Sequence, residues 1–313
     1  MPTTKSMIGF LKSIDALALG ASPWPTLDPN MQHERIDWGA LFPSRSQRDT
    51  LREGFPSIDP WQERLNDSFL DQLRAALQSE PTDDGESCEG WDVCAWYQPI
   101  HYFGPNWGIY IKEECVMRCA LRIARRYRGL FASHAVPAIG RACIRAALCI
   151  YFLHEHYHHK IECLGFRIEV ATGCSTYIPY HQKVYSPLLG TDLVLEEALA
   201  NADSYLRLSV SPYVHWITPD IMRATRSYLE SRFPIDPPGY RMAMNYLNQR
   251  SFNSGENKLQ AQFAEGSQTP LRAAGNWDMA PRMVQSIFNV KSNIWTVLSP
   301  GVRSILPTKP RRP

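Results

Sequence analysis

The segment His154-Glu155-His156-Tyr157-His158 contains two histidines and an acid at a spacing that suits metal chemistry. On a helix four residues turn about 400°, so the imidazoles of His154 and His158 lie about 40° apart on one face and roughly 6 Å apart along the axis. Imidazoles placed in this way can bind one metal ion through bonds of about 2 Å. Glu155 flanks the same face, where its carboxylate could take a proton from a metal-bound water. The His-Glu-x-x-His pattern therefore predicts a hydrolytic metal site with Glu155 as its general base.

The residues on the N-terminal side of the histidines indicate a buried helix. Residues 146–153 (AALCIYFL) are apolar on nearly every side, and Pro137 suits the first turn of a helix. We therefore predict a helix over residues 137–162 that enters the core and carries the histidines with it. A polar, histidine-rich helix end on the surface is the simpler alternative, but it does not account for the apolar run.

A catalytic zinc ion normally has three protein ligands and a water, so a third ligand is needed. Glu162 lies four residues beyond His158 on the same stripe of the helix. It is also about 12 Å along the axis from His154, which is too far for one ion to bridge all three side chains. We expect Glu162 either to support a ligand from behind or to lie on the surface.

A second acidic motif, residues 195–202 (LEEALANA), follows on a separate helix predicted over residues 193–208. Together the two motifs resemble the gluzincin branch of zinc metallopeptidases. They are also similar to the ImmA/IrrE-type regulatory metallopeptidases, whose second motif often reads Glu-x-x-Ala-Asn. The resemblance implies a zincin-like fold, a Zn²⁺ cofactor and a protein or peptide substrate. It further implies that His154, His158 and Glu197 bind the zinc, and that Asn201 braces a metal-binding histidine.

Only one of the two adjacent glutamates can face the metal, because neighbouring residues on a helix point about 100° apart. Glu197 shares a face with Ala198 and Asn201, where small residues allow a close approach to the histidine helix. Glu196 points to another side, which leaves it either behind the ligands or facing solvent. The pattern therefore favours Glu197 as the ligand.

The tetrahedral oxyanion of a hydrolytic reaction needs a hydrogen-bond donor. The segment between the motifs offers four candidates: Tyr177, Tyr180, His181 and Tyr185. We favour His181 and Tyr185 as catalytic groups, and packing in the core is the alternative for each. In zincins the substrate commonly lies along an edge strand above the active helix. Residues 107–111 are predicted as that strand, and the alternative is a hairpin in the core formed with residues 91–97.

Two other functions share part of this pattern. Glu155 and His158 also form the Glu-x-x-His element of di-iron carboxylate proteins, but such a site requires a second copy, which the remaining histidines do not supply. A non-catalytic binding protein could hold the same zinc site, although it would have no need of an intact Glu155. Zinc-dependent cleavage of peptide bonds is the main hypothesis, and a zinc-containing binding protein is the alternative.

The remaining pattern predicts an α+β protein that is mostly helical, with a small antiparallel sheet beside the histidine helix. Further helices are expected over residues 5–19, 60–79, 112–127, 219–233, 240–248 and 280–288, and a strand is expected within residues 165–175. We expect an N-terminal extension over residues 1–87, a zincin-like catalytic domain over residues 88–250 and a C-terminal extension over residues 251–313.

The composition is that of a folded globular protein, with 44% hydrophobic and 11% aromatic residues in a chain of 313. The net charge of +2 gives no reason to expect a nucleic-acid partner. The longest apolar run, residues 142–153, is shorter than the roughly 20 residues of a membrane span. None of the eight cysteines belongs to a Cys-x-x-Cys pair. We therefore expect a cytoplasmic protein with reduced thiols and no membrane partner.

Overall fold

The computed structural model describes residues 4–21, 30–43, 61, 65–79, 94–129, 135–209, 216–267 and 290–309. Three sequence predictions fall wholly or partly outside these ranges: the helix over residues 280–288, residues 91–93 of the predicted hairpin, and residues 60 and 62–64 of the helix over residues 60–79. Within the described ranges the protein is mostly helical and has one small sheet, so the α+β prediction is confirmed.

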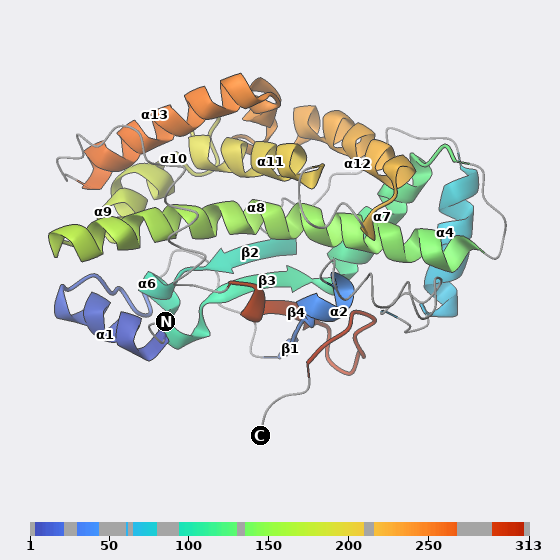
Figure 1. Ribbon diagram of the computed structural model, residues 1–313, viewed down its shortest axis with the longest axis horizontal. Coiled ribbons are helices and arrows are strands. Elements are labelled where there is room, and N and C mark those ends of the chain that lie inside the picture. The colour runs from blue at the N-terminus through green and yellow to red at the C-terminus, as the bar shows by residue number, and fades with distance from the viewer. Residues whose placement is uncertain are drawn as a thin grey trace.

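One long helix, α8 (Val136–Thr172), runs through the middle of the molecule (Figure 1). Pro137 stands in its first turn, where the missing N–H costs no hydrogen bond. Gly173, with a φ of 68°, ends the helix in the left-handed conformation that glycine adopts without strain. The helix predicted over residues 137–162 is confirmed. It continues to Thr172, however, so the strand predicted within residues 165–175 is wrong.

Gly165 accounts for this difference. In a sequence a glycine suggests a break in a helix, yet Gly165 lies inside α8 at a close contact with the segment that follows it. A Cβ atom on Gly165 would lie 2.8 Å from Cβ of Tyr177 and 3.3 Å from Cζ of Phe263. The glycine therefore serves the packing of helices, which no local pattern reveals.

Among the described helices, α8 alone is long and apolar enough to cross a membrane. The core helix of a globular protein passes the same test of length and composition. Of the apolar 18-residue stretch of α8 that passes the test, 78% is buried inside the protein. Its apolar character is therefore accounted for by its position between the sheet and the helices that follow it.

A four-stranded mixed sheet lies on one side of α8, in the order β1-β4-β3-β2 (Figure 1). Its strands are β1 (Gln32–Arg35), β2 (Ala95–Gln98), β3 (Gly108–Lys112) and β4 (Ile294–Leu298). The pairs β2–β3 and β1–β4 are antiparallel, whereas β3 and β4 run parallel with Ile109 beside Ile294. The expectation of a purely antiparallel sheet is therefore wrong. β4 lies far from β3 in the chain, so local pattern could not show its direction.

Strand β3 is internal, because β2 and β4 pair with its two edges. The prediction that residues 107–111 form an edge strand for a substrate is therefore wrong. The alternative of a core hairpin holds for the described residues, with Tyr97 of β2 opposite Ile109 of β3. Both strands pack against α8. The sheet thus packs against one side of the helix that carries the histidines.

The helices that follow α8 cover its other side. α9 (Tyr177–Tyr180), the π-helical turn η3 (His181–Tyr185) and α10 (Ser186–Leu188) form one continuous segment that leads to α11 (Leu195–Leu208). α11 lies along α8, and α13 (Gln249–Ser267) lies outside α11 (Figure 1). The helix predicted over residues 193–208 is confirmed, whereas α13 is a helix that the sequence pattern did not predict.

The remaining elements pack around the two ends of α8. α4 (Asp67–Gln78), α7 (Glu113–Arg125) and α12 (Pro219–Arg232) lie near its N-terminal half, and α1 (Thr4–Ser13) lies beside α6 (Ile100–Phe103) toward the other end (Figure 1). The short elements are α2 (Trp38–Leu41), η1 (Gly104–Asn106), η5 (Phe233–Ile235), η6 (Tyr240–Tyr246) and η7 (Val290–Ser292). The helix predicted over residues 240–248 is thus the 3₁₀ helix η6.

Cys94 and Cys115 form a disulfide bond, with their Cα atoms 5.5 Å apart. Cys94 precedes β2 and Cys115 lies in the first turn of α7, so the pairing of β2 with β3 brings the two residues together. The expectation of reduced thiols is wrong for this pair. The other cysteines among the described residues remain as thiols: Cys119, Cys143, Cys149, Cys163 and Cys174.

Candidate metal centre

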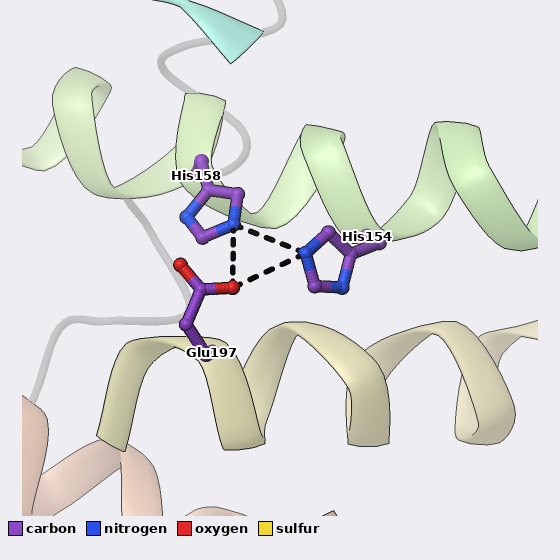
Figure 2. Close-up of side chains that lie close together, drawn as sticks. All are labelled: His154, His158 and Glu197. Carbon is purple, nitrogen blue, oxygen red and sulfur yellow. Dashed lines mark hydrogen bonds and ion pairs between the residues drawn. The ribbon is translucent and has the colours of Figure 1, made fainter. Parts of the chain in front are cut away.

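His154, His158 and Glu197 form a cluster between α8 and α11 (Figure 2). The two Nε2 atoms are 3.3 Å apart, and Glu197 Oε2 lies 3.3 Å from His154 Nε2 and 3.4 Å from His158 Nε2. The side chains of His154 and Glu197 are buried, and that of His158 is 12% exposed. Three possible ligand atoms therefore converge on one point, and the group could hold a metal ion.

The spacing of these three atoms fits a small tetrahedral ion. Ligand atoms bound to zinc at about 2.0 to 2.1 Å in a tetrahedron lie roughly 3.3 to 3.4 Å from one another. Glu197 Oε2 is also a buried oxygen with no hydrogen-bond partner of ordinary geometry, as expected of an atom that faces a cation. Among the described residues no second cluster of this kind occurs, so the paired site of a di-iron protein is not found there.

Helix geometry positions the three side chains. His154 and His158 stand one turn apart on α8, and Glu197 stands in the first turn of α11, where the helix dipole favours negative charge. Ala198 and Ala202 on α11 are buried. α11 packs along α8, and small buried side chains of this kind permit such packing.

Asn201 holds the ring of His154. Its Oδ1 lies 2.9 Å from His154 Nδ1, and its Nδ2 donates to the carbonyl of Tyr240 at 3.3 Å. Because Nδ2 is the donor of the amide, Oδ1 must accept from His154, which places the proton of a neutral imidazole on Nδ1. The lone pair of His154 Nε2 then faces the cluster. Asn201 thus has the bracing position that the sequence resemblance implied.

Glu196 holds the ring of His158 in a similar way. Glu196 Oε1 lies 2.7 Å from His158 Nδ1, and Glu196 Oε2 accepts a hydrogen bond of 2.5 Å from the hydroxyl of Tyr180. A carboxylate behind a metal-binding histidine orients the ring and raises its basicity. Glu196 is buried. The sequence left two positions open for Glu196, one supporting a ligand and one facing solvent. The structure places it against His158, where it supports the ring.

Tyr185 contacts the possible ligand carboxylate itself. Its hydroxyl donates to Glu197 Oε1, whereas the histidines face Oε2. A phenol has one proton to donate, so this proton is already used in the structure. The fold brings Tyr185 to the cluster, as the sequence predicted, but directs it at Glu197 rather than at a position for an oxyanion.

Glu155 lies beside the cluster without joining it. Its Oε1 is 4.0 Å from His154 Nε2, and its side chain is 3% exposed. The carboxylate is therefore close to the point where the three ligand atoms converge, yet it is not one of them. The structure thus places Glu155 beside the histidine pair, and its role as a general base remains a prediction.

His181 lies in the π-helical turn, with its ring centroid 4.9 Å from that of Tyr185. Its Nδ1 is 3.2 Å from the hydroxyl oxygens of both Tyr102 and Ser186. Burial, together with the nearby charge of His158, lowers the pKa of His181 to about 3. At neutral pH this imidazole is therefore uncharged and can donate one hydrogen bond.

The charges of the cluster shift its pKa values in opposite directions. Burial alone would lower the pKa of His158, but the charge and close approach of Glu197 and the hydrogen bond of Glu196 raise it well above its usual value. The pKa of His154 is also raised, because the close approach of Glu197 and the charge of Glu155 outweigh burial. Burial alone would raise the pKa of Glu197, yet both imidazoles hold it well below its usual range. The cluster thus attracts positive charge, as a proton or as a metal ion.

No protein-family model, curated protein or solved structure matches this chain. The resemblance to gluzincins therefore remains an expectation from the two sequence motifs, and the cluster of His154, His158 and Glu197 does not by itself identify that family.

Glu162 has neither of the two roles predicted for it. It is 1% exposed, and its Oε1 lies 2.6 Å from His101 Nδ1, while its Oε2 accepts from the hydroxyl of Tyr97. Glu169 Oε2 lies 2.8 Å from the other ring nitrogen of His101. The axial rise of α8 carries Glu162 past His154 and His158 to the place where the helix meets β2 and α6. There it belongs to a second buried group of charges.

Two supporting residues could not be recognised from the sequence. Tyr180 is among the oxyanion donors that the sequence offers, but its hydroxyl donates to Glu196 Oε2. Tyr240 stacks on His154, with ring centroids 5.8 Å apart, and supplies the carbonyl that orients Asn201. Neither position carries a signal, because a tyrosine has no diagnostic spacing and a backbone carbonyl is common to every residue.

Proposed function

We propose that the protein is a zinc-dependent hydrolase that cleaves peptide bonds. In this proposal His154, His158 and Glu197 bind the zinc, and Glu155 is the general base. The observation that carries the proposal is the position of the Glu155 carboxylate, 4.0 Å from His154 Nε2 but outside the converging ligand atoms. Structural zinc sites are closed by four protein ligands, whereas catalytic ones have three and a water. Three converging atoms with a carboxylate beside them support the catalytic type.

A zinc ion held at this point would lower the pKa of its bound water to about 7 and polarise a substrate carbonyl. Glu155, with its Oε1 4.0 Å from His154 Nε2, would take a proton from the attacking water and return it to the leaving nitrogen. His154 and His158 keep Nε2 toward the cluster, because Asn201 and Glu196 bind the opposite ring nitrogens. The low dielectric of this buried site strengthens each of these interactions.

His181 is the proposed donor to the developing oxyanion. Its imidazole is neutral at working pH, since burial lowers its pKa to about 3, and its ring packs against Tyr185 at the cluster. Tyr185 is the weaker candidate for this role, because its phenol proton is already donated to Glu197.

A peptide substrate is proposed from the two motifs and from the acid–base arrangement. The leaving nitrogen of a peptide bond must be protonated, and a carboxylate beside the attacking water can carry that proton from one to the other. The resemblance to gluzincins and to ImmA/IrrE-type metallopeptidases supports the same substrate class. We extend the proposal to a zincin-like arrangement of α8, the sheet and α11.

The variant Glu155→Gln tests the general base. It should keep its zinc and its unfolding temperature, because Glu155 is not among the ligands, while cleavage of a proteome-derived peptide library falls by about 100-fold or more. Glu114→Gln changes an exposed glutamate on α7 and serves as the matched control, which should cleave at the wild-type rate. Mass spectrometry of the peptide products gives the readout.

Metal analysis of the same proteins gives a second test. The wild type should carry about one zinc per chain, and His154→Ala or His158→Ala should carry none, since catalytic sites need all three protein ligands.

Cleavage by Glu155→Gln at the wild-type rate would contradict the general-base assignment. If wild type and variant both hold zinc and neither cleaves any peptide, the non-catalytic binding protein is favoured.

A further inference from the structure

Two tyrosines of one short segment hold the two adjacent glutamates of α11. Tyr180 donates to Glu196 Oε2 at 2.5 Å, and Tyr185 donates to Glu197 Oε1. Both phenols are buried. The other oxygens of the two glutamates have different partners. Glu196 Oε1 contacts Nδ1 of His158, whereas Glu197 Oε2 faces the Nε2 atoms of both histidines.

The π-helical turn η3 makes this arrangement possible. Five residues of α-helix turn about 500°, so side chains five positions apart point about 140° away from each other. In η3 the N–H of Ser186 donates instead to the carbonyl of His181, five residues back. This wider turn rotates Tyr185 toward the side of Tyr180, and both phenols reach α11. Single π-helical turns of this kind are frequent at functional sites.

The two oxygens of Glu197 have different surroundings. Oε2 lies 3.3 and 3.4 Å from the two imidazole Nε2 atoms and has no hydrogen-bond partner of ordinary geometry. Oε1 accepts the proton of the Tyr185 hydroxyl. Turning Oε1 toward a metal ion would break a charge-assisted hydrogen bond in a buried site, and such bonds are roughly twice as strong as neutral ones.

We propose that Tyr185 is a positioning residue that keeps Glu197 bound to the metal through one oxygen. The inference rests on the metal site of the proposed function, and it does not depend on peptide cleavage. A catalytic zinc site needs one position for water beside its three protein ligands. A second bond from Glu197 would crowd that position, and the contact with Tyr185 prevents it.

Cobalt(II) in place of zinc tests this inference, because its visible absorption is stronger in four-coordinate than in five-coordinate sites. Tyr185→Phe removes one hydroxyl and lets Oε1 of Glu197 join the metal, so the cobalt-loaded full chain should absorb more weakly than the wild type. Tyr180→Phe is the matched control, since it removes an equivalent buried hydroxyl that acts through Glu196. It should weaken zinc binding by about 10-fold or more and keep the wild-type cobalt intensity.

Equal cobalt spectra for the wild type and Tyr185→Phe would overturn the inference, as would a wild type that binds neither cobalt nor zinc. If circular dichroism shows that Tyr185→Phe does not fold, a crystal structure of the zinc-loaded wild type decides. One oxygen of Glu197 within about 2.2 Å of the zinc supports the inference, and two such oxygens overturn it. None of these readouts needs a substrate. An absence of peptidase activity would therefore refute the proposed function and leave this inference standing.

Discussion

Asn201 Oδ1 lies 2.9 Å from His154 Nδ1, and this contact determines which ring nitrogen faces His158 and Glu197. The amide of Asn201 cannot turn over, because its Nδ2 donates to the carbonyl of Tyr240. The tautomer of His154 therefore depends on α11 and η6, two elements that follow it in the chain. His158 is oriented separately, by Glu196 and Tyr180.

Asn201→Ala should weaken zinc binding by about 10- to 100-fold, the usual effect of removing a residue that orients a ligand. The imidazole of His154 could then rotate or change tautomer. The control is Asn257→Ala, which changes an exposed residue of α13 and should leave the affinity unchanged. Competition with a chromophoric chelator measures the zinc Kd. Equal affinities for Asn201→Ala and the control would contradict the bracing role.

The two adjacent glutamates should give different results. Glu197→Ala removes a ligand atom and should abolish zinc binding. Glu196→Ala removes only the support of His158, so it should hold zinc when the metal is in excess, with a Kd raised by about 10- to 100-fold. Metal analysis after gel filtration distinguishes them. The reverse order would show that the ligand assignment on α11 is displaced by one residue.

His101 should make the stability of the fold depend on pH. Burial alone would lower its pKa, but the charge of Glu169 and hydrogen bonds with Glu162 and Glu169 raise it to about 9. An unfolded histidine titrates near pH 6.5, so the folded protein holds the proton more tightly. The stabilisation is therefore complete below about pH 6.5 and is lost as the pH rises through about 9. It corresponds to a free energy of the order of 3 kcal/mol.

Urea denaturation of the zinc-loaded protein at several pH values tests this dependence. The wild-type free energy of unfolding should fall between about pH 6.5 and 9, and His101→Gln should be less stable at low pH and show a smaller fall. His33→Gln, in strand β1, is the histidine control and should retain the wild-type slope. If the free energy of unfolding of His101→Gln falls with pH as steeply as that of the wild type, groups other than His101 cause the fall.

Gly165 and Gly9 should respond in opposite ways to alanine. Both lie inside helices, and alanine favours a helix over glycine by about 1 kcal/mol. Nothing lies within 4 Å of a Cβ on Gly9, so Gly9→Ala should stabilise the protein. A Cβ on Gly165 would lie 2.8 Å from Cβ of Tyr177, and overpacking costs about 1 to 3 kcal/mol.

Thermal unfolding of the two glycine variants compares these effects directly. Because Tyr177 begins the segment that carries Tyr180 and Tyr185, Gly165→Ala should also weaken zinc binding. A stabilised Gly165→Ala with wild-type zinc affinity would show that α9 can move away from α8 without disturbing the metal cluster.

The sequence by itself determined the parts of this protein that helix geometry controls. The spacing of His154 and His158 sets their common face, and the angle between neighbouring residues on a helix means that Glu196 and Glu197 point to different sides. The apolar run before His154 predicted a buried helix, and the small residues beside Glu197 predicted that a second helix approaches it closely. In each case the separation in sequence fixes a direction in space, because the helix is regular.

The tertiary structure alone decided the remaining contacts. The parallel pairing of β3 with β4, the Cys94–Cys115 bond and the pairing of Glu162 with His101 each join segments that are distant in the chain. The π-helical turn that directs Tyr185 at Glu197 is a local irregularity, and a periodic pattern assumes that such irregularities are absent. Spacing along a sequence reports only on regular, local geometry. These contacts depend on how separate segments pack, and only the folded structure shows that.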